Sequence, residues 1–442
     1  MAETAENNGG GRIEEKVCED RISVLPDDLL VSILLLVPTK DAVATMILSK
    51  RWRFVWTMLP TLEYKENNND DDESKKSVWW FLKRSLELYK SPFLEILCME
   101  HDPRCHTDAS FENLVAKAVD GRVHKLLWSA DPTRLPKSLF TCETLVDLTL
   151  SHKILVDFPS SCCLPSLLLL CLHYVVYEDE ASLVRFLSSC PGLEKLCVKR
   201  KKDDNMTKFC VKVPTLWLLA YDNSASLPDD NGGCLVIDTP ALTNFYLTDY
   251  SGDSCSIENM PCFEDVSIDV DQPFPNIDKF FTSFSTVFSL ELLLTDETIV
   301  CCSKINFSRL TKCKIVPFDS DWMDSLVPLL NNTPRLKSLV VDYRSTHQSP
   351  IASATWSERG YNPECLYSSL EKFELIDYGG REEEEELVEY ILSTSRCLKT
   401  VTIYLKSTLE PEIKDTMMEK LEAMDRFSGA CQLLFKTEYV NN

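Results

Sequence analysis

One cluster of side chains has the residue types and spacing of a metal site: Cys98, His101, Cys105 and His106. Zinc takes four nitrogen or sulfur ligands in tetrahedral geometry, which such a cluster can supply in principle. Cys98, however, lies in the apolar string LEILCM, which favours a packed strand, and no second Cys/His pair follows at zinc-finger spacing. We therefore expect a structural role for these residues, with no metal and no cofactor.

Recognised catalytic motifs are absent from the sequence. It contains no G-x-S-x-G, no H-E-x-x-H and neither of the glycine-rich motifs that bind phosphates or dinucleotides. An enzyme that uses the long segment 343–365 as an active-site lid is an alternative. That segment offers few acid/base candidates beyond His347, Glu358 and Glu364. We therefore predict a non-catalytic protein.

Two charged runs each have two interpretations. Lys199–Lys202, with the sequence KRKK, either directs the chain to the nucleus or forms a solvated loop after a strand. Two aspartates follow at once, which favours the loop. Glu382–Glu386 either binds cations or forms the solvated face of a helix, and we favour the helix face.

The composition excludes several classes of partner. The chain has 442 residues, a net charge of −23 and a pI near 4.8. Such a charge repels phosphate backbones and anionic surfaces, so we expect neither nucleic acid nor membrane as a partner. The 19 cysteines form no C-x-x-C pair and stand mostly in apolar strings, as reduced thiols do. With no apolar signal near the start, we expect the chain in the cytoplasm, the nucleus or both.

A single repeat dominates the chain after about residue 91. Its pattern, L-x-x-L-x-L, recurs thirteen times, and the steps from Val123 onward are 22, 22, 26, 23, 26, 21, 24, 23, 26, 34 and 28 residues. Most of these steps fit leucine-rich repeats, which recur every 20–29 residues or so. The alternating pair points two apolar side chains to one face of a short strand. One such unit cannot bury that face alone, so the repeats are expected to stack into a solenoid.

The segments between the strands are expected to return along the outer face as helices or loops. Apolar stripes predict helices within 179–192 and 322–335, although Pro328 interrupts the second. Near the C-terminus, segment 381–392 begins with glutamates that suit a helix N-terminus. An amphipathic helix and a closing strand at 431–436 follow, so we predict a C-terminal cap.

The segment from Leu25 to Trp56 predicts three short helices. Pro26 fits the first turn of the first helix, and Pro38 stops it. Thr39 and Ser49 are suited to cap the second and third helices. So small a bundle cannot bury all of its apolar side chains, and an exposed apolar helical face usually marks a partner surface.

The string DRISVLPDDLLVSILLLVPTKDAVATMILSKRWRFVW resembles the F-box of plant F-box proteins. Leu35–Leu36 and Met46–Ile47 depart from the family pattern but keep its apolar character. The repeats, together with ECLYSSLEKFEL, EEEEELVEYIL, RCLKTVTIYL and CQLLFK, resemble the plant F-box/leucine-rich-repeat subfamily with a C-terminal FBD domain. The F-box resemblance rests on Leu25, Pro26, Asp27, Leu29, Leu30, Ile33, Leu34, Thr39, Lys40, Leu48, Ser49, Arg51, Trp52 and Trp56.

This resemblance implies a non-catalytic substrate-recognition subunit of a ubiquitin ligase. In the family, the F-box binds the Skp-type adaptor of a cullin–RING ligase, and the repeats would bind a target protein. A ligase-independent interaction scaffold stays open as an alternative. Each apolar F-box residue is equally consistent with packing inside the module. The adaptor-binding residues that the resemblance implies are Leu25, Pro26, Leu29, Leu30, Ile33, Leu34, Leu48, Arg51 and Trp52.

The target surface is expected on the inner strand face, at the positions beside each alternating pair. The candidates there have mixed charges, so no single target chemistry emerges. They are Tyr246, Asp265, Asp269, Lys312, Lys314, Lys372 and Glu374.

We thus predict an α/β fold with three parts. A short N-terminal three-helix F-box precedes a leucine-rich-repeat solenoid, with short parallel strands on the concave face and helices and loops outside. An α+β cap closes its C-terminal end. The predicted boundaries are a disordered tail at 1–19, the F-box at 20–66, a charged linker and connecting helix at 67–90, the solenoid at 91–360, FBD-like repeats and cap at 361–436, and a tail at 437–442.

Overall fold

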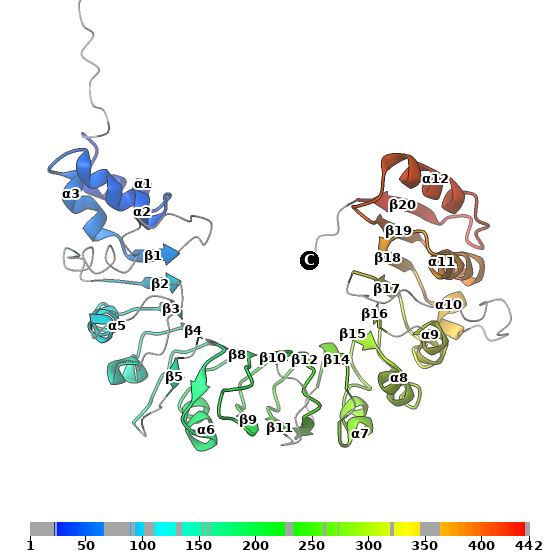
Figure 1. Ribbon diagram of the computed structural model, residues 1–442, viewed down its shortest axis with the longest axis horizontal. Helices are drawn as coiled ribbons and strands as arrows, with labels where there is room; N and C mark the ends of the chain where they lie inside the picture. Colours follow the sequence, from blue (N-terminus) through cyan, green and yellow to red (C-terminus); the bar gives the residue numbers. More distant parts are fainter. Residues whose placement is uncertain are drawn as a thin grey trace, which may run out of the picture.

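The structure, a computed structural model, forms an open horseshoe (Figure 1). A helical module lies at one end, and a helix and strand close the other. Predictions for the N-terminal tail, the charged linker and the long 345–362 segment fall outside the described residues. The structure describes residues 24–65, 93–100, 110–129, 135–225, 233–344 and 363–437, with short gaps at 153, 157–158, 160, 260–261, 273 and 319–321, together with Ile22 and Tyr89.

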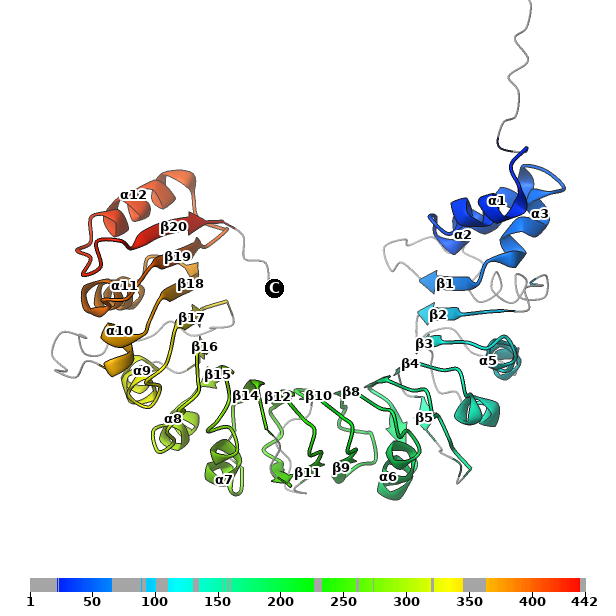
Figure 2. The ribbon, with the colours of Figure 1, turned by 180° about the vertical axis from the view of Figure 1, so that it is seen from behind.

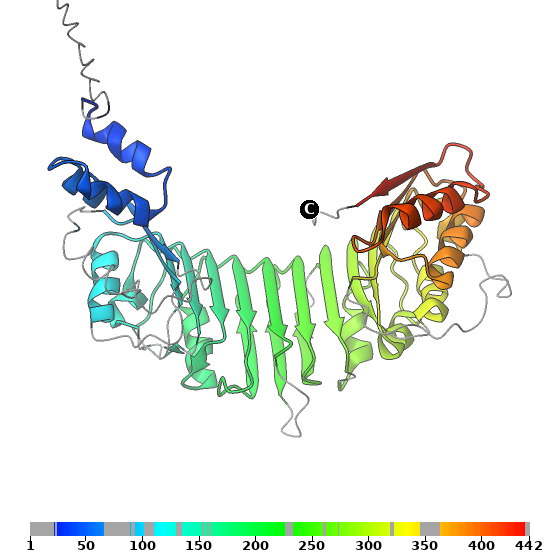
Figure 3. The same cartoon turned by 45° about the horizontal axis from the view of Figure 1, so that its top comes forward.

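One parallel sheet runs through the whole horseshoe and lines its inner face (Figures 1 and 3). Each of the thirteen predicted repeats contributes one of its 15 strands, and the closing strand is present as well. The remaining strand, β1, was not predicted. The strands are β1 (Thr61–Lys65), β2 (Ile96–Glu100), β3 (Lys125–Ser129), β4 (Asp147–Ser151), β6 (Leu169–His173), β8 (Lys195–Lys199), β10 (Leu218–Asn223), β12 (Asn244–Asp249), β14 (Asp265–Val270), β15 (Ser289–Leu294), β16 (Lys312–Pro317), β17 (Ser338–Asp342), β18 (Lys372–Tyr378), β19 (Thr400–Leu405) and β20 (Gln432–Lys436).

The strands pair in register, so each repeat position forms a row that crosses the sheet. Leu170 of β6, for example, pairs with Leu196 of β8, and Leu196 pairs with Leu219 of β10. These residues are fully buried in one continuous core under the sheet. The residues between them are partly exposed on the inner face. The alternation predicted from the sequence is therefore confirmed, because a strand turns successive side chains to opposite faces.

Helices cover the outer face towards both ends of the horseshoe, as predicted (Figures 1 and 2). The helix within 179–192 buries Leu183, Phe186 and Leu187, and the helix within 322–335 continues through Pro328. The outer helices are α5 (Ser110–Asp120), the 3-10 helix η3 (Lys137–Thr141), α6 (Glu180–Ser188), α7 (Ile277–Thr282), α8 (Asp296–Cys302), α9 (Trp322–Asn331), α10 (Glu364–Ser368), α11 (Glu382–Thr394) and α12 (Pro411–Glu422).

The middle of the outer face differs from the prediction, because strands lie there where helices or loops were expected. A three-stranded sheet consists of β9 (Lys208–Lys212), β11 (Cys234–Asp238) and β13 (Ser254–Glu258). Beside it, β5 (Leu155–Val156) pairs with β7 (Val176–Tyr177). The strings KFCVK and CLVID are short and rich in aromatic and β-branched residues, which suits a pleated surface better than a helix.

At the C-terminal end, α11, α12 and β20 form the predicted cap. The interpretation of the glutamate run as a solvated helix face is wrong in part, because Glu384 is buried. Its carboxylate accepts hydrogen bonds from the backbone N–H groups of Gly379 (2.9 Å) and Arg381 (3.0 Å). Burial raises the pKa of Glu384, and it raises the pKa of Glu383 to about 7.

The N-terminal helical module is joined directly to the sheet. Its helices are shorter than predicted, and Pro38 precedes the second helix as its N-cap. Thr39 does not cap that helix: its hydroxyl accepts a hydrogen bond from the backbone N–H of Glu63 in β1, at 2.9 Å. Ser49 accepts one from the N–H of Trp52, at 3.4 Å. The elements are α1 (Asp27–Leu34), α2 (Thr39–Ala44), α3 (Trp52–Val55) and the 3-10 turns η1 (Thr45–Ile47) and η2 (Trp56–Met58).

Candidate functional site

Three of the predicted adaptor-binding residues form the core of the helical module. Leu30 is completely buried, and Leu34 and Trp52 are 3% and 5% exposed. They pack with Val55 and Trp56 in a cluster separate from the solenoid core. These three side chains therefore support the module from within and offer no surface to a partner in this structure.

The other predicted residues reach the surface. Leu29, Ile33 and Leu48 are exposed, as is Pro26. Leu25 is partly buried. Among the described residues, eleven of the twenty exposed large apolar side chains lie within residues 22–58. Such a concentration on one small module is a strong indication of a protein interface.

Arg51 connects the beginnings of α1 and α3 by hydrogen bonds. Its guanidinium donates to the Asp27 carboxylate from Nε (2.9 Å) and Nη2 (2.6 Å), and it also donates to the carbonyl of Leu25. The start of α1 is thereby tied to the start of α3. A planar guanidinium suits this role because it donates in a fixed fork. Arg51 thus positions the neighbouring residues, and a direct contact of its own with an adaptor stays a prediction.

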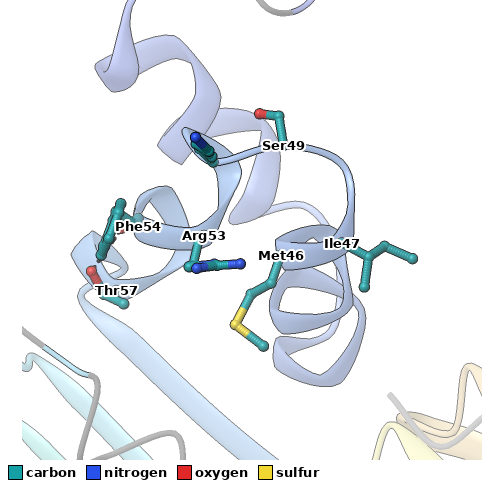
Figure 4. Close-up of a pocket in the computed structure, with 7 residues that line it drawn as sticks. Met46, Ile47, Ser49, Arg53, Phe54 and Thr57 are labelled. Carbon is teal, nitrogen blue, oxygen red and sulfur yellow. Dashed lines mark hydrogen bonds between the residues drawn. The ribbon is translucent and has the colours of Figure 1, made fainter.

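The module also carries a shallow groove beside η1 and α3, with a volume of about 670 Å³ (Figure 4). Ile47 points away from Arg53 in that view. Lys50 and Arg53 give the groove a positive charge, in contrast to the net charge of −23 of the whole chain. Its lining residues are Met46, Ile47, Ser49, Lys50, Arg53, Phe54 and Thr57.

Several of the exposed apolar residues are absent from the predicted set. Leu36, Ile47 and Phe54 are more than half exposed, and Met58 is exposed as well. The apolar excess of the module was visible in the sequence. The sequence did not show which of these apolar residues turn outward, because the helices are only four to eight residues long.

The predicted target-binding residues all lie on the inner face of the sheet. In the strands from β12 to β18 they fall into three rows of register partners. The first row holds Asp265, Lys312 and Lys372, and the second holds Tyr246, Lys314 and Glu374. Asp269 alone belongs to the third row. The Tyr246 hydroxyl contacts the Asp265 carboxylate at 3.2 Å, across neighbouring strands. Lys312 and Lys372 are exposed, whereas Tyr246, Asp265, Asp269, Lys314 and Glu374 are partly exposed.

Lys314 is held by two carboxylates of neighbouring strands. Its ammonium group lies 2.7 Å from Glu291 and 3.3 Å from Asp342. Burial lowers the pKa of Lys314, but the two carboxylates outweigh it, so the pKa is raised. The prediction missed Glu291 and Asp342. The rule that selected Lys314 would have found Glu291, had it been applied to the weaker repeat copy at Val287.

The structure describes only part of the metal-like cluster that begins at Cys98. Cys98 is buried in β2, and the rest of its metal-like cluster lies outside the described residues. No group of three or more His, Cys, Asp or Glu in the described part of the chain is arranged to hold a metal. No helix of the described chain has both the length and the apolar character that crossing a membrane requires.

The basic run at Lys199–Lys202 is not simply a solvated loop, as the sequence suggested. Arg200 is buried, and its guanidinium pairs with the buried carboxylate of Asp204 at 2.7 Å. It also donates to the hydroxyl of Tyr221. Only the lysines of the run are accessible, so Arg200 belongs to the fold of the solenoid.

Three family models match the chain. The model described as "F-box domain" matches residues 22–64, which contain the helical module and most of β1. A model of the LRR repeats of "FBD-associated F-box protein At5g56370" matches residues 108–264. The model described as "FBD" matches residues 358–403. None of the three describes a catalytic domain.

The chain is also similar to plant proteins over almost its whole length. It is 52% identical to "Putative FBD-associated F-box protein At1g05080" of Arabidopsis thaliana, covering 96% of this chain and 99% of the relative. It is 45% identical to "Putative F-box/FBD/LRR-repeat protein At1g22000" of the same species, with 95% and 92% covered. Identity to the Arabidopsis thaliana "F-box/FBD/LRR-repeat protein At5g56420" is 36%, with 94% and 99% covered. The chain belongs to the plant F-box/leucine-rich-repeat proteins that carry an FBD domain.

Proposed function

We propose that this protein is the substrate-recognition subunit of a Skp–cullin–F-box ubiquitin ligase. The helical module, residues 22–58, binds the Skp-type adaptor, and the inner face of the solenoid binds a target protein. Other subunits transfer ubiquitin, and this chain contributes proximity and orientation. It works in the cytoplasm, the nucleus or both.

The observation that carries this proposal is the concentration of exposed apolar side chains on the module. The module hides a complete core of its own and still leaves Leu29, Ile33 and Leu48 at the surface. A partner that covers them removes apolar area from water, which stabilises a complex by roughly 25 cal/mol per Å² before the opposing entropy is counted. Lys50 and Arg53 in the adjacent groove favour an acidic partner.

A pair of matched isoleucine variants tests the adaptor contact. Ile33 is 42% exposed on α1, and Ile413 is 45% exposed on α12. We expect Ile33→Asp in the full chain to weaken binding to a purified Skp-type adaptor by about 30-fold or more, as for an interface hot spot. Ile413→Asp places the same charge at the same exposure outside the module and should bind as the unaltered chain does. Isothermal calorimetry measures both affinities.

Leu34→Asp is unsuitable for this test, because it buries a charge in the core of the module. If the unaltered chain does not bind the adaptor, or if Ile33→Asp binds as tightly as Ile413→Asp, the ligase proposal fails. A ligase-independent interaction scaffold is then the better account, since it needs the solenoid but no adaptor.

Target capture requires point variants rather than removal of the module. Thr39 holds the N–H of Glu63, so deleting the helices would also damage β1. We would purify the full chain and an Ile33→Asp/Leu48→Asp variant from plant cells with the proteasome inhibited. Proteins bound by both chains are target candidates, and proteins lost from the variant belong to the ligase. A Glu291→Lys variant then asks whether a candidate binds the inner face, because it reverses a charge there.

A further inference from the structure

Two cysteines face each other on the inner surface of the solenoid. Cys171 of β6 and Cys197 of β8 are register partners on adjacent strands. Both are partly exposed on the inner face, between buried residues of the same strands. Adjacent strands lie about 4.8 Å apart. That separation falls within the range of about 4.4–6.8 Å between Cα atoms that disulfides require.

The surroundings of the two sulfur atoms favour a thiolate. A hydrogen bond from Cys171 and the charges of Lys195 and Lys199 lower the pKa of Cys197 from 9 to about 7, although burial and Asp147 oppose them. The same hydrogen bond, together with burial, raises the pKa of Cys171. The pair therefore loses one proton near neutral pH and keeps the other.

The site has a small neighbour on one side. The register partner of Cys197 in β10 is Ala220, and Cys197 itself is partly exposed. On the other side, Thr149 of β4 is the register partner of Cys171. Many other cysteines in the described part of the chain are buried, and burial raises the pKa of Cys190, Cys313 and Cys365. A low pKa and access to solvent are what distinguish reactive cysteines from structural ones.

We infer that Cys171 and Cys197 form a redox-active dithiol, which peroxides oxidise to a disulfide across the inner face. In the first step the Cys197 thiolate attacks one oxygen of hydrogen peroxide, giving a sulfenic acid and releasing hydroxide. The Cys171 thiol then attacks the Cys197 sulfur, and water leaves as the S–S bond forms. The peroxide takes up both electrons. This inference does not depend on the proposed ligase role.

The test uses the full-length chain and hydrogen peroxide as the probe. After limited oxidation at pH 7, free thiols are blocked with N-ethylmaleimide, and tandem mass spectrometry locates cross-linked peptides. We expect a Cys171–Cys197 disulfide at peroxide concentrations that leave the exposed Cys397 reduced. In Cys171→Ser no partner thiol remains, so sulfenic acid should accumulate at Cys197 and be trapped by dimedone. Cys397→Ser, which changes an exposed thiol elsewhere, should form the cross-link as the unaltered chain does.

Alkylation rates provide a second measurement. At pH 7, iodoacetamide should modify Cys197 at least about fivefold faster than Cys397. The thiolate is the form of cysteine that reacts, and the lowered pKa of Cys197 makes its thiolate abundant at this pH. Cys171→Ala removes the hydrogen bond and should slow Cys197 severalfold, with circular dichroism confirming that the chain is folded. The inference is wrong if Cys197 reacts no faster than Cys397, or if peroxide oxidises Cys397 before it joins Cys171 to Cys197.

Discussion

Asp204→Asn tests how a buried ion pair stabilises the middle of the solenoid. The Nε and Nη2 atoms of Arg200 donate to the two carboxylate oxygens of Asp204 at 2.7 and 2.9 Å. The side chains are 7% and 2% exposed. Nη1 of Arg200 also donates to the Tyr221 hydroxyl at 3.0 Å, and Nη2 to the carbonyl of Met206 at 2.6 Å. The pair therefore connects β8, its following loop and β10.

The expected effect of Asp204→Asn follows from the charge it leaves behind. An arginine stays protonated at every accessible pH, so Arg200 remains a buried cation without a counter-ion. Removing one partner of a buried pair destabilises a protein by about 3–5 kcal/mol. Since about 1.4 kcal/mol corresponds to a factor of ten, local opening should increase by roughly two to four orders of magnitude. The double variant Arg200→Met/Asp204→Leu should recover most of that loss, because it leaves no charge to solvate.

Hydrogen exchange of the full chain, followed by mass spectrometry, measures how often each strand opens locally. Amides of β8 and β10 should exchange much faster in Asp204→Asn, while those of β18 and β19 keep their rates, because repeats contact only their neighbours. Lys399→Gln breaks an ion pair with Glu371 at the surface and serves as the matched control, with no change expected. Unchanged exchange in β8 and β10, or a double variant as damaged as the single one, would refute this reasoning.

Three further variants test other parts of the fold. Phe284 is fully buried with its ring centroid 4.9 Å from Phe280, so Phe284→Ala should destabilise the chain by about 3–5 kcal/mol in urea unfolding. Burial raises the pKa of Glu383 from 4.5 to about 7, so its contribution to stability is complete below pH 4.5 and is lost as the pH rises through 7. The thermal midpoint should therefore fall between pH 6 and pH 8, and fall less in Glu383→Gln. Thr39→Val leaves the N–H of Glu63 without its acceptor and should cost about 1–3 kcal/mol, visible as faster exchange in β1.

The sheet was predictable from the sequence because its repeat is periodic. Each L-x-L position pair buries two apolar side chains, and thirteen copies over a nearly constant step leave little freedom in strand order. β1 was missed because the repeat was sought only after about residue 91, whereas its copy follows the helical module directly. Leu59, Leu62 and Tyr64 are all buried, and the copies at Val123 and Leu216 also end in an aromatic residue, so the same pattern applied further upstream would have found the strand.

The candidate surfaces were less predictable, and for a different reason in each case. Leu29 and Leu30 are both leucines in one short helix, so only packing decides that Leu29 is exposed and Leu30 buried. The outer strands β9, β11 and β13 lie where only helices or loops were expected, although KFCVK and CLVID have the aromatic and β-branched residues that suit a strand. The cysteine pair, in contrast, was accessible to sequence reasoning: Cys171 and Cys197 are 26 residues apart, and so are the repeat positions Leu167 and Leu193.

The attachment of the helical module bears directly on how the proposed function would work. β1 belongs to the same segment as the module, yet it pairs with β2 along its whole length and continues the solenoid sheet. The Thr39 hydroxyl and the Glu63 N–H join α2 to that strand. The module and the inner face are thus coupled through a partly buried hydrogen bond and a continuous sheet, and only Leu59 and Pro60 separate η2 from β1. In the proposed ligase, the distance between a bound target and the adaptor would then depend on the strand to which the target binds. The reason is that the continuous sheet holds each strand of the inner face in a fixed position relative to the module.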